Sequence, residues 1–232
     1  MPHAIIVAHG QPSDPDPAEM ALAAYANQVN MLARGVTVHS ATLAAPGKLE
    51  AKMDSLPEDS VIYPLFMANG WFVTSALPKR IGDHNLRILD PLGIDPELPE
   101  LAADALREAL SEKHWEAHST DLVLAAHGSG RSRNPSFVAS TFASELGKTL
   151  AFNSIRVGFV EEPPSISEAA SGTREQSLCL PFFACTGGHV IEDVPEELES
   201  ANFRGSLLPV VGELPQIQRQ IAKKLRQAFE LA

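Results

Sequence analysis

The sequence predicts an α/β protein made of two tandem lobes, each a small parallel sheet flanked by helices. The first observation is an internal repeat: IIVAHG at residues 5–10 recurs as LVLAAHG at 122–128, and PLF at 64–66 recurs as PFF at 181–183. Matched positions lie 117 to 119 residues apart, about half of the 232-residue chain, which indicates two copies of one folding unit. The second observation is that continuous apolar runs alternate with helical patterns, as is typical of parallel sheets covered on both faces.

The first copy is predicted to form four strands, each followed by a helix. The first strand is the apolar run 4–8, and Pro17 then marks the first turn of a helix over 17–33. The other strands are expected at 36–42, 60–66 and 86–90, and the other helices at 47–56, 74–82 and 97–112.

The second copy repeats this order after a joint at 113–120. Strands are expected at 121–126, 155–160, 177–183 and 207–211, and helices at 135–150, 165–173, 192–200 and 214–230. Pro135 opens the first of these helices, as Pro17 does in the first copy. The predicted domains are residues 1–117 and 118–232.

Composition narrows the partners and the expected location. The formal net charge of −11 argues against nucleic acid and anionic membrane as partners, because both require a broad basic surface. No apolar run approaches the ~20 residues of a membrane span, and the N-terminal run is too short for a signal-peptide core. Cys179 and Cys185 are too few for a disulfide framework, so we interpret them as packing thiols of a cytoplasmic protein. The oligomeric state is not indicated.

Three side chains of the second copy are expected to meet at one edge of its sheet. His127 follows the first strand, Glu161 the second and His189 the third. Ligands of open parallel sheets bind beyond the carboxyl ends of the strands, and the first and third strands are often neighbours. Two imidazoles and a carboxylate suit a divalent transition metal. Glu162, the next residue, is an alternative to Glu161.

Two arginines follow the His127 turn. Arg131 and Arg133 lie in the loop that begins with Gly128 and Ser129, beside the candidate metal site. Guanidinium groups in this position suit a substrate rich in carboxylates or phosphates.

The order and spacing of these segments resemble the signature blocks of the sirohydrochlorin chelatases, the small class II metal chelatases of the CbiX type. The blocks are VLAAHGS at 123–129, GFVEEP at 158–163, and LPFF, GHV and DVP within 180–195. The resemblance extends over both copies, as in the long two-lobe members of the family. It implies two tandem chelatase-like lobes.

The resemblance also implies an activity, the insertion of a divalent metal into sirohydrochlorin, an anionic tetrapyrrole, in sirohaem or cobalamin biosynthesis. Fe²⁺ is favoured and Co²⁺ is the alternative; the metal is a substrate, and no tightly bound cofactor is expected. The metal-facing histidines of the family correspond to His127 and His189, and its acidic residue corresponds to Glu161. Substrate binding is assigned to Ser129, Arg131, Arg133 and His9.

The first copy departs from this pattern. His9 is the counterpart of His127, but Phe72 stands where the second copy has His189, and Leu43 is expected at the position of Glu161. A phenylalanine cannot bind a metal, but it can stack on a flat macrocycle or fill a core. We therefore expect one working site, in the second lobe, and a degenerate site in the first.

Two rival functions make different demands on these residues. Phosphoryl transfer through a histidine nucleophile is disfavoured, because Ala8 and Ala126 precede the two histidines where such enzymes have an arginine. A non-catalytic carrier of metal or tetrapyrrole stays open. It would bind its ligand without accelerating metal insertion.

Overall fold

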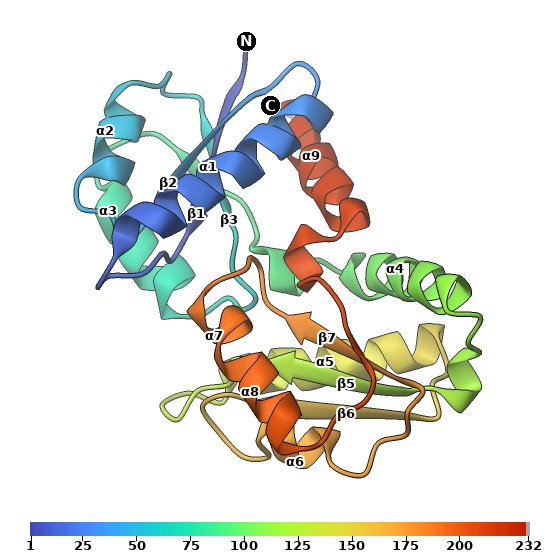
Figure 1. Cartoon of the computed structure of the whole chain (residues 1–232). Coiled ribbons are helices and arrows are strands. Elements are labelled where there is room, and N and C mark those ends of the chain that lie inside the picture. Colours follow the sequence, from blue (N-terminus) through green and yellow to red (C-terminus); the bar gives the residue numbers. More distant parts are fainter. Residues whose placement is uncertain (231–232) are drawn as a thin grey trace. The chain divides into compact units, whose positions relative to one another are not determined.

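Four parallel strands form the first sheet of the computed structural model, which describes residues 1–230 (Figure 1). Their order across the sheet is β2-β1-β3-β4, so β1 lies between β2 and β3. The strands are β1 (His3–Ala8), β2 (Thr37–Thr42), β3 (Val61–Pro64) and β4 (Arg87–Ile88). All four predicted strands are present, and the last two are shorter than expected.

Helices cover both faces of this sheet. They are α1 (Pro15–Leu32), α2 (Lys48–Asp54) and α3 (Leu77–Ile81), with a π-type turn η1 (Phe72–Ala76) before α3 and a 3₁₀ turn η2 (Leu92–Ile94) after β4. Ile5, Leu49 and Leu77 are fully buried in one core cluster between β1, α2 and α3. Pro78 lacks the N–H that a regular helix would donate to the carbonyl of Thr74. The helix predicted over 74–82 accordingly begins earlier, as the wider turn η1.

The second sheet repeats this topology in the order β6-β5-β7-β8. Its strands are β5 (Asp121–Ala126), β6 (Ser154–Phe159), β7 (Ser177–Phe182) and β8 (Ser206–Leu207). Its helices and turns are η3 (Ala117–Ser119), α5 (Asn134–Thr149), α6 (Ile166–Ala170), α7 (Gly188–Ile191), α8 (Asp193–Ser200) and η4 (Val211–Glu213). Val123, Ile166 and Val194 are fully buried in the core that β5 forms with α6 and α8. The prediction that the first and third strands are neighbours is confirmed for both copies.

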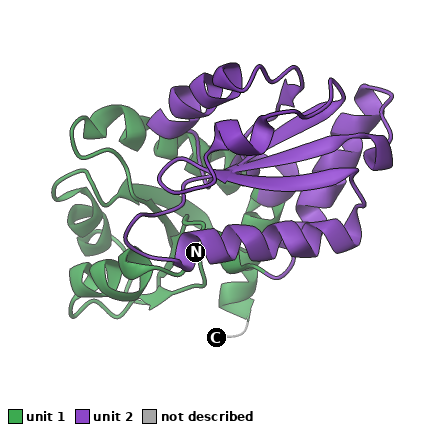
Figure 2. Cartoon of the chain, turned by 90° about the horizontal axis from the view of Figure 1, so that it is seen from below, with its two compact units in different colours: residues 1–95, 218–232 green, residues 96–217 purple. Residues whose placement is uncertain are grey.

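The helices that end the two copies are exchanged between the compact units. These helices are α4 (Leu98–Glu112) and α9 (Pro215–Glu230). One unit comprises Met1–Asp95 and the chain from Gln218 onward, and the other comprises Pro96–Ile217 (Figure 2). Within the first unit, the Gln218 side chain of α9 donates to the Gln28 side chain of α1 at 2.8 Å. The compact units therefore differ from residues 1–117 and 118–232, which delimit the two copies in the sequence.

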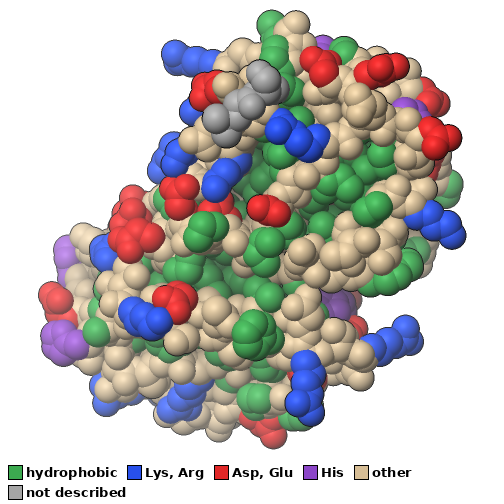
Figure 3. Space-filling view, turned by 180° about the vertical axis from the view of Figure 1, so that it is seen from behind, with side chains coloured by type: hydrophobic (Ala, Val, Ile, Leu, Met, Phe, Trp, Pro, Cys, Tyr) green, Lys and Arg blue, Asp and Glu red, His purple; other side chains and the backbone are tan. Residues whose placement is uncertain are grey.

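The surface shown in Figure 3 mixes charges of both signs. Acidic and basic side chains are interspersed on this face, and no broad basic area is seen on it. Among the helices within residues 1–230, none is long and apolar enough to cross a membrane.

Candidate metal centre

The carboxyl edge of the second sheet carries the three predicted metal ligands. His127 is the first residue beyond β5, which is flanked by β6 and β7. Glu161 follows β6, and its N–H donates to the carbonyl of His127 at 3.0 Å. His189 lies in α7, after β7. Because neighbouring parallel strands end at the same edge, the topology brings these residues together.

A left-handed turn at Gly128 directs the chain away from His127. The φ angle of Gly128 is +70°, and a Cβ atom there would lie 2.8 Å from Glu162 Oε1 and 2.9 Å from Phe159 Cβ. Any other residue would be both strained and crowded at this position. The N–H of Ser129 donates to Glu162 Oε1 at 2.7 Å. Glu162 thus stabilises the turn that presents His127.

Of the two adjacent carboxylates, Glu161 is the one beside the histidines. Its Oε2 lies 3.8 Å from His127 Nδ1, and the two side chains are 47% and 45% exposed. Glu162 is occupied by the Ser129 N–H. Of the two alternatives that the sequence leaves open, the structure therefore places Glu161 nearer to His127.

His189 has a carboxylate partner that the sequence analysis did not assign to the site. Its Nδ1 lies 2.5 Å from Oδ2 of Asp193, four residues later at the start of α8. Because a carboxylate only accepts, Nδ1 carries the hydrogen, and in the neutral ring Nε2 of His189 then has the lone pair. Carboxylates commonly orient metal-binding histidines in this way. The sequence signal that could have indicated this pair is the four-residue spacing of His189 and Asp193, which corresponds to about one helical turn.

The two histidines and Glu161 form a three-ligand cluster. One potential ligand atom of each lies within 4.8 Å of the other two, and this is the only such group of three within residues 1–230. The rings of His127 and His189 meet edge to face, with centroids 4.6 Å apart. His127 Nδ1 lies 3.0 Å from the carbonyl oxygen of Gly128, which only accepts, so its Nε2 also keeps a lone pair. Two nitrogens and one oxygen on an exposed edge form an open site for a divalent transition metal.

Of the two arginines predicted to bind the substrate, one lines a hollow together with Glu161 and the other does not. A hollow of about 740 Å³ is lined by Gly130, Arg131 and Glu161. The backbone N–H of Arg131 donates to Ser129 Oγ at 3.2 Å, a hydrogen bond within the loop that follows His127. Arg133 is exposed nearby but does not line the hollow.

The first copy keeps the shape of the histidine pair but not its chemistry. The ring of Phe72 lies edge to face with His9 at a centroid distance of 4.4 Å, against 4.6 Å for the His127–His189 pair. His9 Nδ1 lies 2.7 Å from the carbonyl of Gly10, as His127 Nδ1 does from that of Gly128 at 3.0 Å. Phe72 therefore takes the place of His189 in space as well as in sequence.

The counterpart of Glu161 is Ala44, and the expectation for Leu43 is wrong by one residue. Ala44 donates its N–H to the carbonyl of His9, whereas Glu161 donates to that of His127. The N–H of Leu43 donates to the carbonyl of Ala8, which is one residue earlier on both segments. The backbone register, which the sequence does not show directly, decides this alignment. The first copy still lacks the carboxylate.

An aromatic group surrounds Phe72. Its ring centroid lies 5.2 Å from that of Trp71 and 6.1 Å from that of Phe66. Trp71 is 67% exposed and Phe72 is 37% exposed. Trp71 was not among the residues predicted from the sequence to belong to the site.

The two cysteines lie outside the metal cluster. Burial raises the pKa of Cys179, in the core around β7, to about 12. Burial and then the charge of Glu213 raise the pKa of Cys185 to about 11. Both are free thiols, which agrees with their interpretation as packing residues.

Comparison with known proteins gives a family and several structural relatives. The sequence model of the family CbiX matches residues 3–109 and 121–228. A solved structure described as CbiX, the terminal enzyme for biosynthesis of siroheme in denitrifying bacteria, is 42% identical with a TM-score of 0.86, and the match covers 99% of both chains. A search of curated proteins found no match.

Two more distant structures share the fold. SirB from Bacillus subtilis, solved with Fe³⁺, is 16% identical with a TM-score of 0.74, and the match covers 98% of this chain and 96% of that one. DR2241 from Deinococcus radiodurans, a multi-domain protein with structural similarity to chelatases, is 22% identical with a TM-score of 0.72. That match covers 97% of this chain and 54% of the other.

Proposed function

The chain belongs to the CbiX family, and on that premise we propose that it is a sirohydrochlorin chelatase that inserts Fe²⁺, or alternatively Co²⁺, into its tetrapyrrole substrate. The observation that carries the proposal is the cluster of His127, Glu161 and His189 at the open edge of the second sheet. The ligand set alone suits either ion. The siroheme pathway of the 42% identical CbiX supports iron.

The three residues have two tasks in this reaction. The metal must exchange its water ligands for the four macrocycle nitrogens, and the macrocycle must lose two N–H protons. The lone pairs on Nε2 of His127 and His189 can hold the incoming ion or accept a proton, because a neutral imidazole nitrogen can do either. The Glu161 carboxylate offsets the charge of the ion and offers a further proton acceptor. No covalent intermediate with the protein is required.

Binding of the macrocycle is assigned to residues around the cluster. Arg131, in the hollow beside Glu161, is placed to pair with a peripheral carboxylate of the substrate. Ser129 and Arg133 belong to the same loop. We also assign His9, whose ring meets that of Phe72 edge to face within the first copy, to substrate binding. The cytoplasm, where both thiols stay reduced, is the location we propose.

The decisive experiment is anaerobic metal insertion followed by absorbance. Fe²⁺ or Co²⁺ is added to sirohydrochlorin with the wild type, His127→Ala, His189→Ala and His9→Ala. We expect each of the first two substitutions to lower the insertion rate by about 100-fold or more, as loss of a proton acceptor or ligand does. His118→Ala, an exposed histidine near the joint between the copies, is the matched control and should keep full activity.

The outcomes separate the alternatives. Full activity in both His127→Ala and His189→Ala would exclude the assigned site. If His9→Ala were the only inactive variant, the working site would have to be assigned to the first copy. Tight tetrapyrrole binding by the wild type, measured by fluorescence quenching and without any acceleration of insertion, would identify a carrier.

A further inference from the structure

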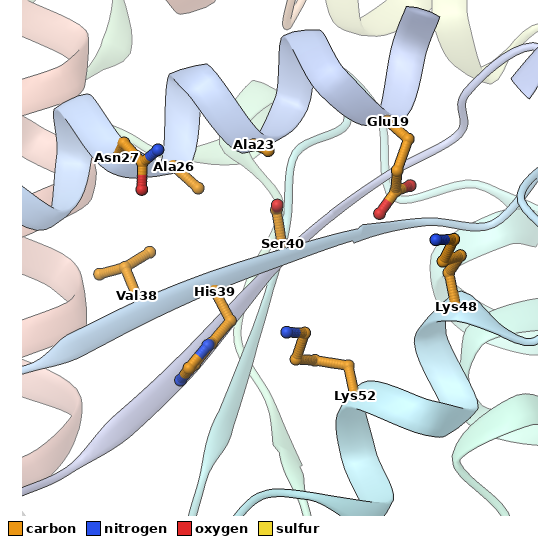
Figure 4. Close-up of a pocket in the computed structure, with 9 residues that line it drawn as sticks. All are labelled: Glu19, Ala23, Ala26, Asn27, Val38, His39, Ser40, Lys48 and Lys52. Carbon is orange, nitrogen blue, oxygen red and sulfur yellow. The ribbon is translucent and has the colours of Figure 1, made fainter. Parts of the chain in front are cut away.

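The exposed edge of β2 carries a pocket that the metal centre does not use. We name it the β2-edge pocket; it has a volume of about 330 Å³ and is lined by residues of α1, β2 and α2 (Figure 4). Ser40 points toward α1, whereas His39 points to the opposite side of the strand, where Lys48 and Lys52 extend from α2. The pocket therefore lies along the exposed edge of β2, and side chains line it on both sides of the strand.

The strand register leaves outward backbone groups along this edge. Thr37 and Leu43 donate their N–H groups toward β1, to the carbonyls of Pro2 and Ala8. Because alternate residues of a parallel edge strand face outward, the N–H groups of the even-numbered residues 38, 40 and 42 point away from β1.

Side chains of α1 satisfy two of these three N–H groups. The Val38 N–H donates to Asn30 Oδ1 and the Thr42 N–H donates to Glu19 Oε2, both at 2.8 Å. For the Ser40 N–H between them, no acceptor occurs among the described residues. A peptide cannot add here as a further strand, because it would need the N–H groups that α1 already occupies. One small acceptor facing Ser40 is compatible with this edge.

The side chains around Ser40 supply positive charge. Lys48 and Lys52 lie one helical turn apart on the same side of α2, and neither forms an ion pair within residues 1–230. Glu19 is the one carboxylate lining the pocket, so the two ammonium groups leave an excess of one positive charge. Burial, and after it the nearby Lys52 charge and His3, lower the pKa of His39.

We propose that the β2-edge pocket binds a small oxyanion, a free phosphate or the phosphate group of a metabolite. The Ser40 N–H faces out of the strand edge, the Asn27 and Ser40 side chains line the pocket on the α1 side, and Lys48 and Lys52 line it on the α2 side. Lysine binds phosphate as a point charge, so the two flexible ammonium groups can approach a small anion that accepts from the Ser40 N–H. This site is independent of the metal centre.

The test is calorimetric titration of inorganic phosphate into the full chain. We expect saturable one-to-one binding to the wild type and at least tenfold weaker binding to Lys52→Met and to Lys48→Met, which is about 1.4 kcal/mol. Methionine keeps the length and helix propensity of lysine. Lys79→Met removes one charge from an exposed lysine on α3 and is the matched control, with unchanged affinity expected.

Each outcome bears on the proposal. Absence of saturable binding, or equal affinity in Lys52→Met and Lys79→Met, would overturn it. Tighter binding of succinate than of phosphate would overturn the assignment to phosphate. Lys52→Met should insert metal at the wild-type rate when no phosphate is present. A failure to bind phosphate would therefore leave the proposed chelatase function unaffected.

Discussion

At the scale of single residues, the site depends on which atom of each imidazole is free. Gly128 and Asp193 supply acceptors for the two Nδ1 atoms, so both histidines present Nε2 lone pairs. Glu162 contributes indirectly by holding the Ser129 N–H. The candidate ligand set was predictable because each member lies in the segment that follows a recognisable strand. Its supporting residues were not, because their roles depend on side-chain direction.

Asp193 should act as a positioning residue. In Asp193→Asn, the side chain can present its amide N–H₂ to His189 Nδ1, which favours the tautomer that has no lone pair on Nε2. We expect kcat for metal insertion to fall by about 10- to 100-fold, with little change in KM for sirohydrochlorin. Glu192→Gln, at the exposed neighbour, should leave both constants unchanged. A change confined to thermal stability would show that Asp193 is merely structural.

At the scale of elements, polar contacts join the amino ends of the strands in the second sheet. Asp121, at the start of β5, is 2% exposed. It accepts hydrogen bonds from Asn153 Nδ2 at 2.6 Å, Ser154 Oγ at 2.7 Å and the Arg174 N–H at 3.1 Å. Burial alone would raise the pKa of Asp121, but these hydrogen bonds outweigh it and hold the pKa below its ordinary value.

Asp121→Asn should therefore destabilise the fold in a pH-dependent way. Because the folded pKa is depressed, the carboxylate stabilises the fold above its unfolded pKa of about 3.9, and this contribution is lost as the pH falls through the folded value. We expect the free energy of unfolding to drop by about 1–3 kcal/mol at pH 7. In urea titrations, the difference from wild type should be constant from pH 7 to 5 and narrow below about pH 4.

Asp104→Asn is the control for this prediction. Asp104 is a half-exposed residue of α4 that pairs with Arg107 at 2.6 Å. Its replacement should change the free energy of unfolding by no more than about 0.5 kcal/mol. A loss in Asp121→Asn that persists unchanged at pH 3 would contradict the role given to the carboxylate.

At the scale of the whole molecule, residues 1–230 contain one candidate metal centre, in the second copy, and an altered counterpart in the first. Both copies place a histidine after the first strand and a ring against it at nearly equal distance. Phe72 and Ala44 replace the second histidine and the carboxylate in the first copy. The two copies share one backbone arrangement, but Phe72 and Ala44 leave the first copy without two of the three candidate ligands.

This asymmetry predicts the metal stoichiometry. Equilibrium dialysis with Co²⁺ should find one ion per wild-type chain and none in His127→Ala/His189→Ala. The combined substitutions Phe72→His and Ala44→Glu should raise the number toward two, because they restore the three-ligand set in the first copy. Phe72→Leu with Ala44→Glu should not. Two ions per wild-type chain would disprove the assignment of a single centre.

The sequence by itself determined the repeat, the order of strands and helices, and the residues that follow each strand. These features are local, since apolar periodicity and turn residues act within a few positions along the chain. Only the tertiary structure placed Glu161 beside His127, aligned Ala44 with Glu161, paired Asp193 with His189, and divided α4 and α9 between the compact units. These outcomes depend on strand register and on the direction of side chains that lie far apart in sequence, where a shift of one residue changes which group faces the site.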